Sequence, residues 1–308
     1  QKYSLLLNEQ GGILDDWMVS RPQVEGFMLV VNAACKEADI AHMQAHLSGV
    51  CDVIPITDRA LLALQGPQAE AALARLVPEV AAMRFMDVGV FGDLWVSRSG
   101  YTGEDGFEMS LPMAQAEAFA VSLLDMPEVM PIGLGARDSL RLEAGLPLYG
   151  HDMNADVDPV SADLLFGINK RRRTEGGFPG ADRIIREINE GTARKWVGLK
   201  IEGRLPAREG AEVFSGSDKI GTVTSGGFSP TLQAPIAMAY VASEYAATGR
   251  RREQAGRRSA VDHVEPRAFL QPEAAVAVVP CQIVEAQLAA RRIAAQAQRH
   301  LSAIGAAV

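Results

Sequence analysis

Residues 3–20 read YSLLLNEQGGILDDWMVS, two apolar runs on either side of a polar turn that ends in two glycines. Apolar runs around such a turn predict a β-hairpin, with strands over residues 3–7 and 13–20. Gly11 and Gly12 lie where the chain reverses, and glycine adopts backbone conformations there that other residues disfavour.

Two acids, Asp15 and Asp16, interrupt the second apolar run of this hairpin. Neighbouring strand residues point to opposite faces, so only one of the two can face the core or a cleft. A carboxylate held in an apolar cleft is a candidate general base or cation stabiliser. In the alternative interpretation, both acids only solvate the hairpin.

A second glycine-rich stretch, SRSGYTGEDGFE, spans residues 97–108 and is flanked by apolar runs. Tyr101 could stack on a flat ring, and Glu108 could accept two neighbouring N–H donors. That pair suits a heterocycle with an amino group beside a ring N–H, although a solvated turn with a salt-bridged glutamate has the same pattern. No G-K-[ST] ending follows the glycines, so the stretch is not a phosphate-binding loop.

A third stretch, GLGARDSLRLEAG (residues 133–145), predicts a helix over residues 135–144. Arg137 and Arg141 are four residues apart and share one face of that helix. Arg137 falls in the first turn, where the helix dipole disfavours a cation. We therefore expect a specific partner for it, namely Asp138, Glu108 or an oxygen of a ligand, and a purely structural ion pair is the alternative.

The remaining apolar patterns predict an α+β fold with a C-terminal all-β barrel domain. Before residue 150 the expected strands and helices are strands 27–31, 60–64, 94–98 and 106–111, and helices 36–48, 68–76 and 113–124. Short strands expected at the barrel are residues 195–201, 211–215, 219–224 and 236–241.

The expected division of the chain is an α+β region over residues 1–165, a β-barrel domain over residues 166–249, and an Ala/Arg-rich tail over residues 250–308. The tail carries no strand pattern that would continue the barrel. Its Ala-rich stretch, residues 283–299, favours a helix.

The composition excludes several classes of protein. The chain has 308 residues and a formal net charge of −8, which argues against nucleic-acid binding. No apolar run is long enough to span a membrane. Three cysteines without a C-x-x-C pair, and His42 and His46 without a third ligand, give no indication of a metal site. The basic run at residues 170–173 is either solvated or a docking patch for an acidic protein partner.

Six collinear stretches together resemble the T-protein (aminomethyltransferase) family of the glycine cleavage system. They are YSLLLNEQGGILDDWMV, LVVNAACKEADIAHMQ, ALLALQGPQA, SRSGYTGEDGFEMSLP, GLGARDSLRLEAGLPLYGHDM and KIGTVTSGGFSPTL. Six motifs in the same order are far more specific than any one alone, and they cover the chain from Tyr3 to about Tyr245.

The resemblance implies a reaction and its participants. A lipoylated H-protein presents an aminomethyl group on the sulfur of its dihydrolipoyl arm, and tetrahydrofolate accepts the one-carbon unit as 5,10-methylenetetrahydrofolate. Ammonia and the reduced arm are released. Tetrahydrofolate acts as a co-substrate, and no metal or redox cofactor is implied. The compartment implied is the bacterial cytoplasm or the mitochondrial matrix.

The resemblance also assigns roles to residues. Asp16 matches the family's functional aspartate, the second acid of its G-G-[IL]-[IL]-D-D stretch. The residues that match folate ligands or line the folate pocket are Glu108, Arg137, Tyr3, Asn32 and Tyr101.

The chain departs from the family pattern at both ends. The family has a long segment before Tyr3 and a Pro-Phe-rich end with terminal tyrosines, whereas this chain diverges after Gly249. An inactive, truncated T-protein is therefore one alternative. A second is the folate-binding domain of a sarcosine or dimethylglycine dehydrogenase, although no dinucleotide-binding G-x-G-x-x-G opens the chain. A third is a non-enzymatic folate-binding paralogue of iron–sulfur assembly, but the cysteine typical of that group near Tyr101 is absent.

Overall fold

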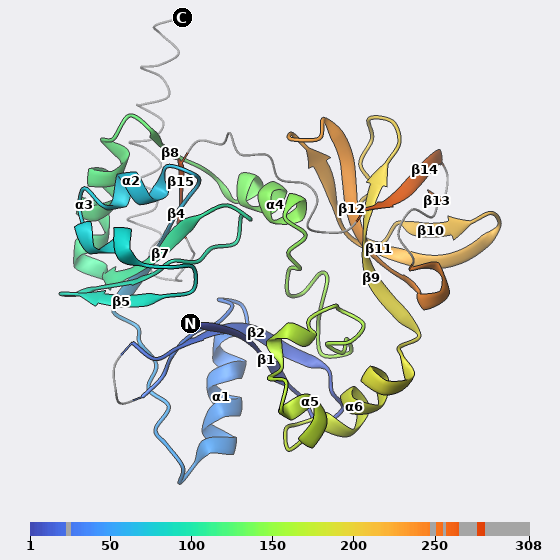
Figure 1. Ribbon diagram of the computed structural model, residues 1–308, viewed down its shortest axis with the longest axis horizontal. Coiled ribbons are helices and arrows are strands. Elements are labelled where there is room, and N and C mark those ends of the chain that lie inside the picture. Colours follow the sequence, from blue (N-terminus) through green and yellow to red (C-terminus); the bar gives the residue numbers. More distant parts are fainter. Residues whose placement is uncertain (23–25, 247–250, 255–256, 265–275, 281–308) are drawn as a thin grey trace, which may run out of the picture.

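The computed structural model describes residues 1–22, 26–246, 251–254, 257–264 and 276–280. Figure 1 shows three bodies of structure, a small sheet, a larger sheet with helices on it, and a barrel. The small sheet has the order β1 (Lys2–Leu7), β2 (Ile13–Ser20) and β3 (Met28–Val30). β1 and β2 pair antiparallel, which confirms the hairpin predicted from residues 3–20.

The larger sheet contains six strands, and most neighbouring pairs are antiparallel. Their order is β5 (Val88–Phe91), β6 (Leu94–Ser97), β7 (Gly106–Pro112), β4 (Arg59–Gln65), β15 (Val276–Pro280) and β8 (Val129–Pro131). The helical segments whose apolar residues share a core with this sheet are α2 (Ala69–Leu73), η1 (Pro78–Ala82) and α3 (Met113–Leu124). Helix α3 buries Ala116, Ala120 and Leu123, a spacing that places all three on one face.

The third body is a closed barrel with its own core. Its strand order is β10 (Glu212–Ser215), β11 (Asp218–Ser229), β12 (Ala234–Ala242), β9 (Arg194–Ile201), β14 (Arg257–Val264) and β13 (Arg251–Gln254). The first four match the strands expected from the sequence. A short helical segment, η3 (Ser243–Tyr245), follows β12.

The expectation that no strand continues the barrel beyond Arg250 was wrong. β13 pairs with β10 and β14 pairs with β9, so these two strands close the barrel. Their arginine-rich sequence hides the usual alternation, and the pairing partners lie far away in the sequence. β15 likewise pairs with β4 in the larger sheet. The expected helix at residues 283–299 lies outside the described residues.

Helix α1 (Lys36–Leu47) forms where the sequence predicts a helix, but the alanines of its apolar pattern are not the residues it buries. Ala38, Ala41 and Ala45 are exposed, and the residue that α1 buries is Asp39. Each alanine methyl gains little free energy from burial, so the apolar pattern of this helix is a weak guide to its orientation.

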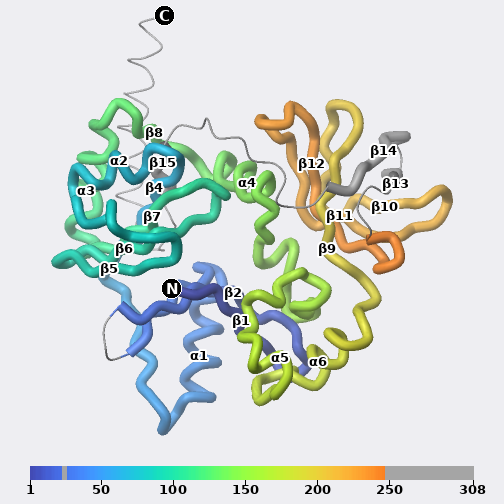
Figure 2. Tube along the Cα trace, viewed as in Figure 1, coloured from blue at the N-terminus to red at the C-terminus, as the bar shows by residue number. Residues whose placement is uncertain are grey.

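The chain between β8 and the barrel has helices as its regular secondary structure. It contains α4 (Leu134–Glu143), η2 (Leu165–Gly167), α5 (Arg172–Glu175) and α6 (Ala181–Glu190). Figure 2 follows this path from α4 down to α5 and α6 and back up to β9. The barrel strands thus begin at Arg194, after these helices, and the domain boundary near residue 166 stays a prediction.

The hairpin turn and the chain near Ala155 pack with almost no space between them. A Cβ atom built on Gly12 would lie 1.7 Å from the Ala155 carbonyl oxygen. Asn8 braces the same contact, because its Nδ2 donates to that carbonyl over 3.0 Å. Gly11 has a φ of +78°, a conformation that favours glycine. The backbone at Ala155 packs against the hairpin turn and therefore requires a glycine at position 12.

Gly12→Ala is expected to destabilise the protein by about 2–3 kcal/mol, because backbone cannot move aside as a side chain can. Gly135→Ala is the matched control, since a Cβ there meets nothing within 4 Å and alanine favours the helix. Urea unfolding of both variants measures the difference, and equal midpoints would contradict the packing argument.

Candidate active site

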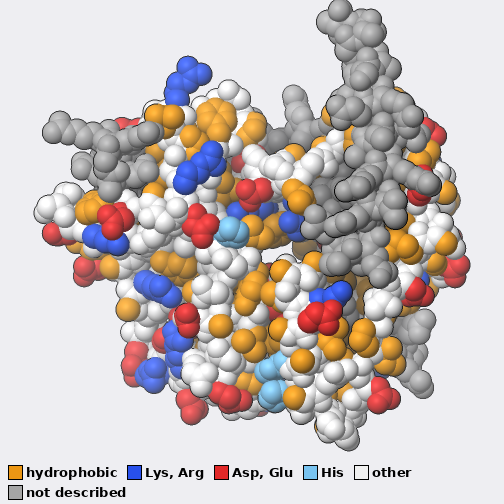
Figure 3. Space-filling model, turned by 180° about the vertical axis from the view of Figure 1, so that it is seen from behind, with side chains coloured by type: hydrophobic (Ala, Val, Ile, Leu, Met, Phe, Trp, Pro, Cys, Tyr) orange, Lys and Arg blue, Asp and Glu red, His pale blue; other side chains and the backbone are white. Residues whose placement is uncertain are grey.

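All six site residues expected from the sequence line one cavity of about 1760 Å³. The small sheet, β6, β7, the N-terminal part of α4 and residues 164–179 contribute to its walls. Figure 3, which shows the molecule from behind, has a hollow near the middle of the molecule, with hydrophobic side chains and some charged ones at its edge. The six residues are Tyr3, Asp16, Asn32, Tyr101, Glu108 and Arg137.

Asp16 faces this cavity from the hairpin and is held by two neighbours. Tyr3 on β1 donates its hydroxyl hydrogen to Oδ2 of Asp16 over 3.0 Å. Asn32 Nδ2 donates to Oδ1 over 2.7 Å. Both carboxylate oxygens therefore have a donor, which fixes the orientation of the group before any ligand binds.

Burial raises the pKa of Asp16 to about 6, and the hydrogen bonds from Tyr3 and Asn32 partly oppose that effect. A carboxyl group with such a pKa changes its charge near the pH at which most enzymes work, which suits proton transfer. Burial, together with the charge and hydrogen bond of Asp16, raises the pKa of the Tyr3 hydroxyl, so Tyr3 stays a hydrogen-bond donor.

Asp15 does not line the cavity and is fully buried. This placement agrees with the strand alternation, which allows only one of the two acids to face the cleft. Asp15 nevertheless contacts the same neighbour as Asp16, since Asn32 donates to it from its side chain over 2.8 Å and from its backbone over 3.1 Å.

Glu108 reaches the cavity because β7 alternates. Phe107, Met109 and Leu111 point into the core, whereas Glu108 and Ser110 line the cavity on the other face. Ser99 donates to Oε2 of Glu108 over 2.7 Å. Burial raises the pKa of Glu108, while the Ser99 hydrogen bond and the charge of Arg137 act in the opposite direction.

Arg137 stacks on the ring of Tyr101, with Cζ 4.5 Å from the ring centroid. The Tyr101 hydroxyl donates to the Pro147 carbonyl, which orients the ring. Arg137 lies in the first turn of α4, as predicted. Of the partners considered for it, Glu108 is within electrostatic reach, whereas Asp138 pairs with Arg141.

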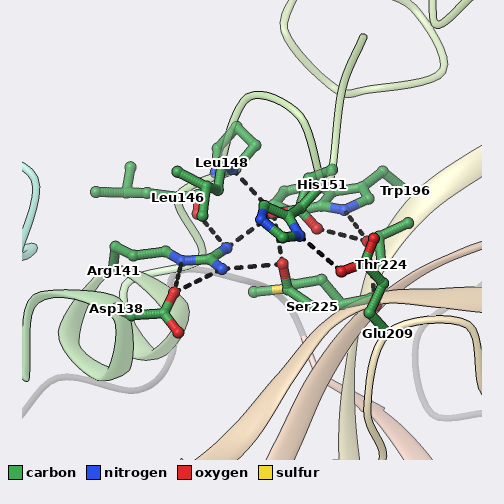
Figure 4. A network of polar contacts seen from close by, with 12 residues as sticks. Asp138, Arg141, Leu146, Leu148, His151, Trp196, Glu209, Thr224 and Ser225 are labelled. Atoms are coloured by element: carbon green, nitrogen blue, oxygen red, sulfur yellow. Dashed lines mark hydrogen bonds and ion pairs between the residues drawn. The ribbon is translucent and has the colours of Figure 1, made fainter. Parts of the chain in front are cut away.

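Arg141 does not line the cavity and instead joins α4 to the barrel (Figure 4). Its guanidinium donates to Asp152 over 2.8 Å and to Ser225 over 2.9 Å, and all three side chains are buried. Sharing a helix face with Arg137 therefore does not give Arg141 a place in the site, because residues four apart are still offset along the helix.

The basic run at residues 170–173 divides between the cavity and internal contacts. Lys170, Arg172 and Arg173 line the cavity, while Arg171 forms an ion pair with Glu175 over 2.6 Å. Arg173 also donates to the Ile168 carbonyl over 2.8 Å. The run is thus part of the cavity rim rather than a wholly solvated loop.

Sequence reasoning did not single out Ser99 or Asp39. Ser99 lies inside the glycine-rich stretch, but a serine there is indistinguishable from an ordinary turn residue. Asp39 falls in the first turn of a helix, where acids are common on the solvated face. Only the approach of α1 to β2 reveals that Asp39 is buried.

Among the described side chains, no group of three or more His, Cys, Asp or Glu residues is arranged to hold a metal ion. His42 and His46 stack with their ring centroids 4.1 Å apart. The helices found in the described part of the chain are too short or too polar to cross a membrane.

Comparisons with known proteins agree with this architecture. The family model described as the GCVT N-terminal domain matches residues 1–172, and the model described as the glycine cleavage T-protein C-terminal barrel domain matches residues 194–269. The crystal structure of the glycine cleavage system aminomethyltransferase T from Bartonella henselae has a TM-score of 0.83 and 41% sequence identity, covering 89% of this chain and 77% of that one.

Curated relatives show the same similarity. The probable mitochondrial aminomethyltransferase of Schizosaccharomyces pombe is 43% identical over 249 residues, which is 78% of this chain and 64% of that protein. The mitochondrial aminomethyltransferase of Flaveria anomala is 44% identical, over 78% of this chain and 62% of its own length. The chain thus spans a little under two thirds of these relatives, with a family model covering more than half of its residues. On this similarity and the shared α+β and barrel architecture, the chain belongs to the glycine cleavage T-protein family.

Proposed function

We propose that the chain is an aminomethyltransferase of the glycine cleavage system. It would transfer the one-carbon unit from the aminomethyl-dihydrolipoyl arm of an H-protein to tetrahydrofolate, with release of ammonia. The observation that carries the proposal is the placement of Asp16, a partly buried and doubly hydrogen-bonded carboxylate, in the same cavity as Glu108 and the Arg137–Tyr101 stack.

The cavity walls fit a pterin with a charged tail. Glu108 offers a partly buried carboxylate whose Oε2 accepts from Ser99, so Oε1 is the oxygen available to N–H donors of the heterocycle. Arg137 offers N–H donors to a carbonyl or carboxylate oxygen, and Tyr101 holds it by stacking. Lys170 and Arg172 on the rim supply positive charge for an anionic tail.

Asp16 would act on the charge that develops during transfer. Losing ammonia from the aminomethyl carbon builds positive, iminium-like charge, and a fixed carboxylate in a poorly solvated cavity stabilises it. The same carboxylate can orient the attacking folate nitrogen or accept its proton, and its pKa of about 6 suits that task. Tetrahydrofolate supplies the accepting nitrogens when bound, and the residues above require no metal.

The partner and the compartment follow from the same proposal. The lipoylated H-protein would insert its arm toward Asp16, and the cavity rim contributed by residues 170–173 would face it. The relatives compared above include mitochondrial proteins and a bacterial one, so we place this chain in the mitochondrial matrix or the bacterial cytoplasm. Folate is the small-molecule ligand, and neither nucleic acid nor membrane takes part.

Glu108→Ala is expected to weaken tetrahydrofolate binding by about 10-fold to 100-fold, because a buried charge-assisted hydrogen bond contributes about 1.5–3 kcal/mol. Isothermal titration calorimetry measures the change. Glu79→Ala is the matched control, because Glu79 is exposed on η1 and does not line the cavity. Equal affinities of the two variants would remove Glu108 from the folate site.

A further inference from the structure

Three carboxyl groups lie close together behind the cavity wall, and only one of them reaches the cavity. Asp15 and Asp16 are neighbours on β2, and Asp39 approaches Asp15 from the first turn of α1 at hydrogen-bonding range. Asp15 is 0% exposed and Asp39 is 2% exposed. The proposed chemistry uses Asp16 alone and leaves the two more deeply buried acids without a role.

Asn32 connects the buried pair to Asp16. Its Nδ2 donates to Oδ1 of Asp15 over 2.8 Å and to Oδ1 of Asp16 over 2.7 Å. Its backbone N–H donates to Oδ2 of Asp15 over 3.1 Å. Asp15 thus holds Asn32 at two points, and Asn32 passes that orientation on to Asp16.

Asp39 needs a proton to occupy its position. Its Oδ2 atom is buried and has no hydrogen-bond partner, and among the described residues no Lys or Arg forms an ion pair with any of the three acids. Ionising two carboxyl groups that are in contact and shielded from water costs too much free energy. One of them therefore keeps its proton and donates a hydrogen bond to the other.

The other titratable groups around this pair are also acids. The Cys35 thiol and the Tyr149 hydroxyl interact electrostatically with both Asp15 and Asp39, and Asp16 interacts with Asp15. Burial, followed by the hydrogen bond and charge of Asp15, raises the pKa of Asp39 to about 8. Burial and the Asp15 charge raise the pKa of Cys35 to about 12, so the thiol stays neutral.

We propose that Asp39 holds a proton that it donates to Asp15, and that this carboxyl pair fixes Asn32 and thereby aims Asp16 into the cavity. Asp39 is a positioning residue in this scheme and touches no substrate. Its contribution to turnover rests on the proposed function, whereas the shared proton is a property of the folded chain alone.

Infrared difference spectroscopy of the intact protein tests the shared proton without any activity assay. The wild type is expected to show the carbonyl stretch of a protonated carboxylic acid that disappears across about pH 8. Asp39→Asn should lack that band but keep the one that disappears near pH 6, which belongs to Asp16. Glu37→Gln is the control on the same helix turn, because the Glu37 side chain is 86% exposed, and it should retain both bands.

Linkage gives a second measurement. A carboxyl group whose pKa is higher in the folded than in the unfolded chain binds an extra proton when folded, so stability falls as pH rises from about 4 toward about 8. Urea unfolding of the wild type should show this fall, and Asp39→Asn, whose amide donates to Asp15 at every pH, should reduce its slope. An unchanged slope, or no band near pH 8 that Asp39→Asn removes, overturns the shared proton.

The positioning role is tested by comparing Asp39→Asn with Asp39→Leu. The amide keeps a donor and should preserve turnover, whereas leucine should lower kcat by about 10-fold to 100-fold and shift the pH at which Asp16 titrates, with folate affinity unchanged. If leucine prevents folding, Asp39→Ala, which also lacks a donor and is smaller, replaces it in both measurements. A wild type that shows the shared proton but no transfer activity would contradict the proposed function and leave this inference standing. An Asp16 titration that is the same in all variants would overturn the positioning role.

Discussion

Asp16→Asn is expected to lower the rate of aminomethyl transfer by about 10²-fold to 10³-fold while leaving tetrahydrofolate binding nearly intact. Asparagine keeps the shape of the side chain but loses the negative charge that would stabilise the developing cation. Folate affinity should change little, because the residues proposed to bind the heterocycle are Glu108 and Arg137, on β7 and α4. Single-turnover assays with aminomethylated H-protein measure the rate, and calorimetry measures the affinity.

Glu9→Gln is the matched control for this variant, because Glu9 is an exposed acid in the turn of the same hairpin. The wild-type rate should also rise with pH through about pH 6, since Asp16 must be ionised to act. Unchanged transfer in Asp16→Asn would contradict the assigned role, and so would a pH profile that is flat through this range.

Asp152→Ala is expected to destabilise the protein by about 3–5 kcal/mol, the cost of leaving a buried charge without its partner. The Arg141 and Asp152 side chains are 4% and 0% exposed, and Asp152 also accepts hydrogen bonds from Ser225 and from the Leu148 backbone. Removing the carboxylate therefore leaves several buried donors unsatisfied at the joint between α4 and the barrel (Figure 4). Chemical denaturation followed by circular dichroism measures the loss.

Asp138→Asn is the control within the same network. Asp138 contacts the same guanidinium over 2.8 Å, but its side chain is 60% exposed. An exposed ion pair contributes about 0–1 kcal/mol, so this variant should unfold close to the wild type. If the two variants lost equal stability, burial would not explain the stabilising effect of the contacts between α4 and the barrel.

Local patterns were sufficient to predict much of this fold. The hairpin needed only its two apolar runs and the glycines between them, and α3 needed only the spacing of its apolar residues. The alternation in β2 also decided that Asp15 and Asp16 face different surroundings. These features depend on residues that are near one another in the sequence, where the periods of strands and helices apply directly.

Features that depend on distant contacts were not predicted. The strands β13 and β14 are recognised by their partners β10 and β9 rather than by their own sequence. Asp39 resembles a solvated helix acid until α1 is placed beside β2. Arg141 and Arg137 share a helix face. Arg141 nevertheless donates to Ser225 of the barrel, whereas Arg137 stacks on Tyr101 in the cavity. The collinear family motifs supplied the site assignment that isolated patterns left open.

The cavity walls come from parts of the chain that are far apart in sequence, from the hairpin through β7 and α4 to residues 164–179. A molecule bound there acts as a crosslink between these parts. Any local unfolding that moves one wall away from the others releases the ligand. A bound ligand therefore raises the free energy of every such opening, by about 2.7 kcal/mol at a ligand concentration of 100 times Kd. Substrate supply would then govern how long the folded chain survives proteolysis, in addition to how fast it turns over.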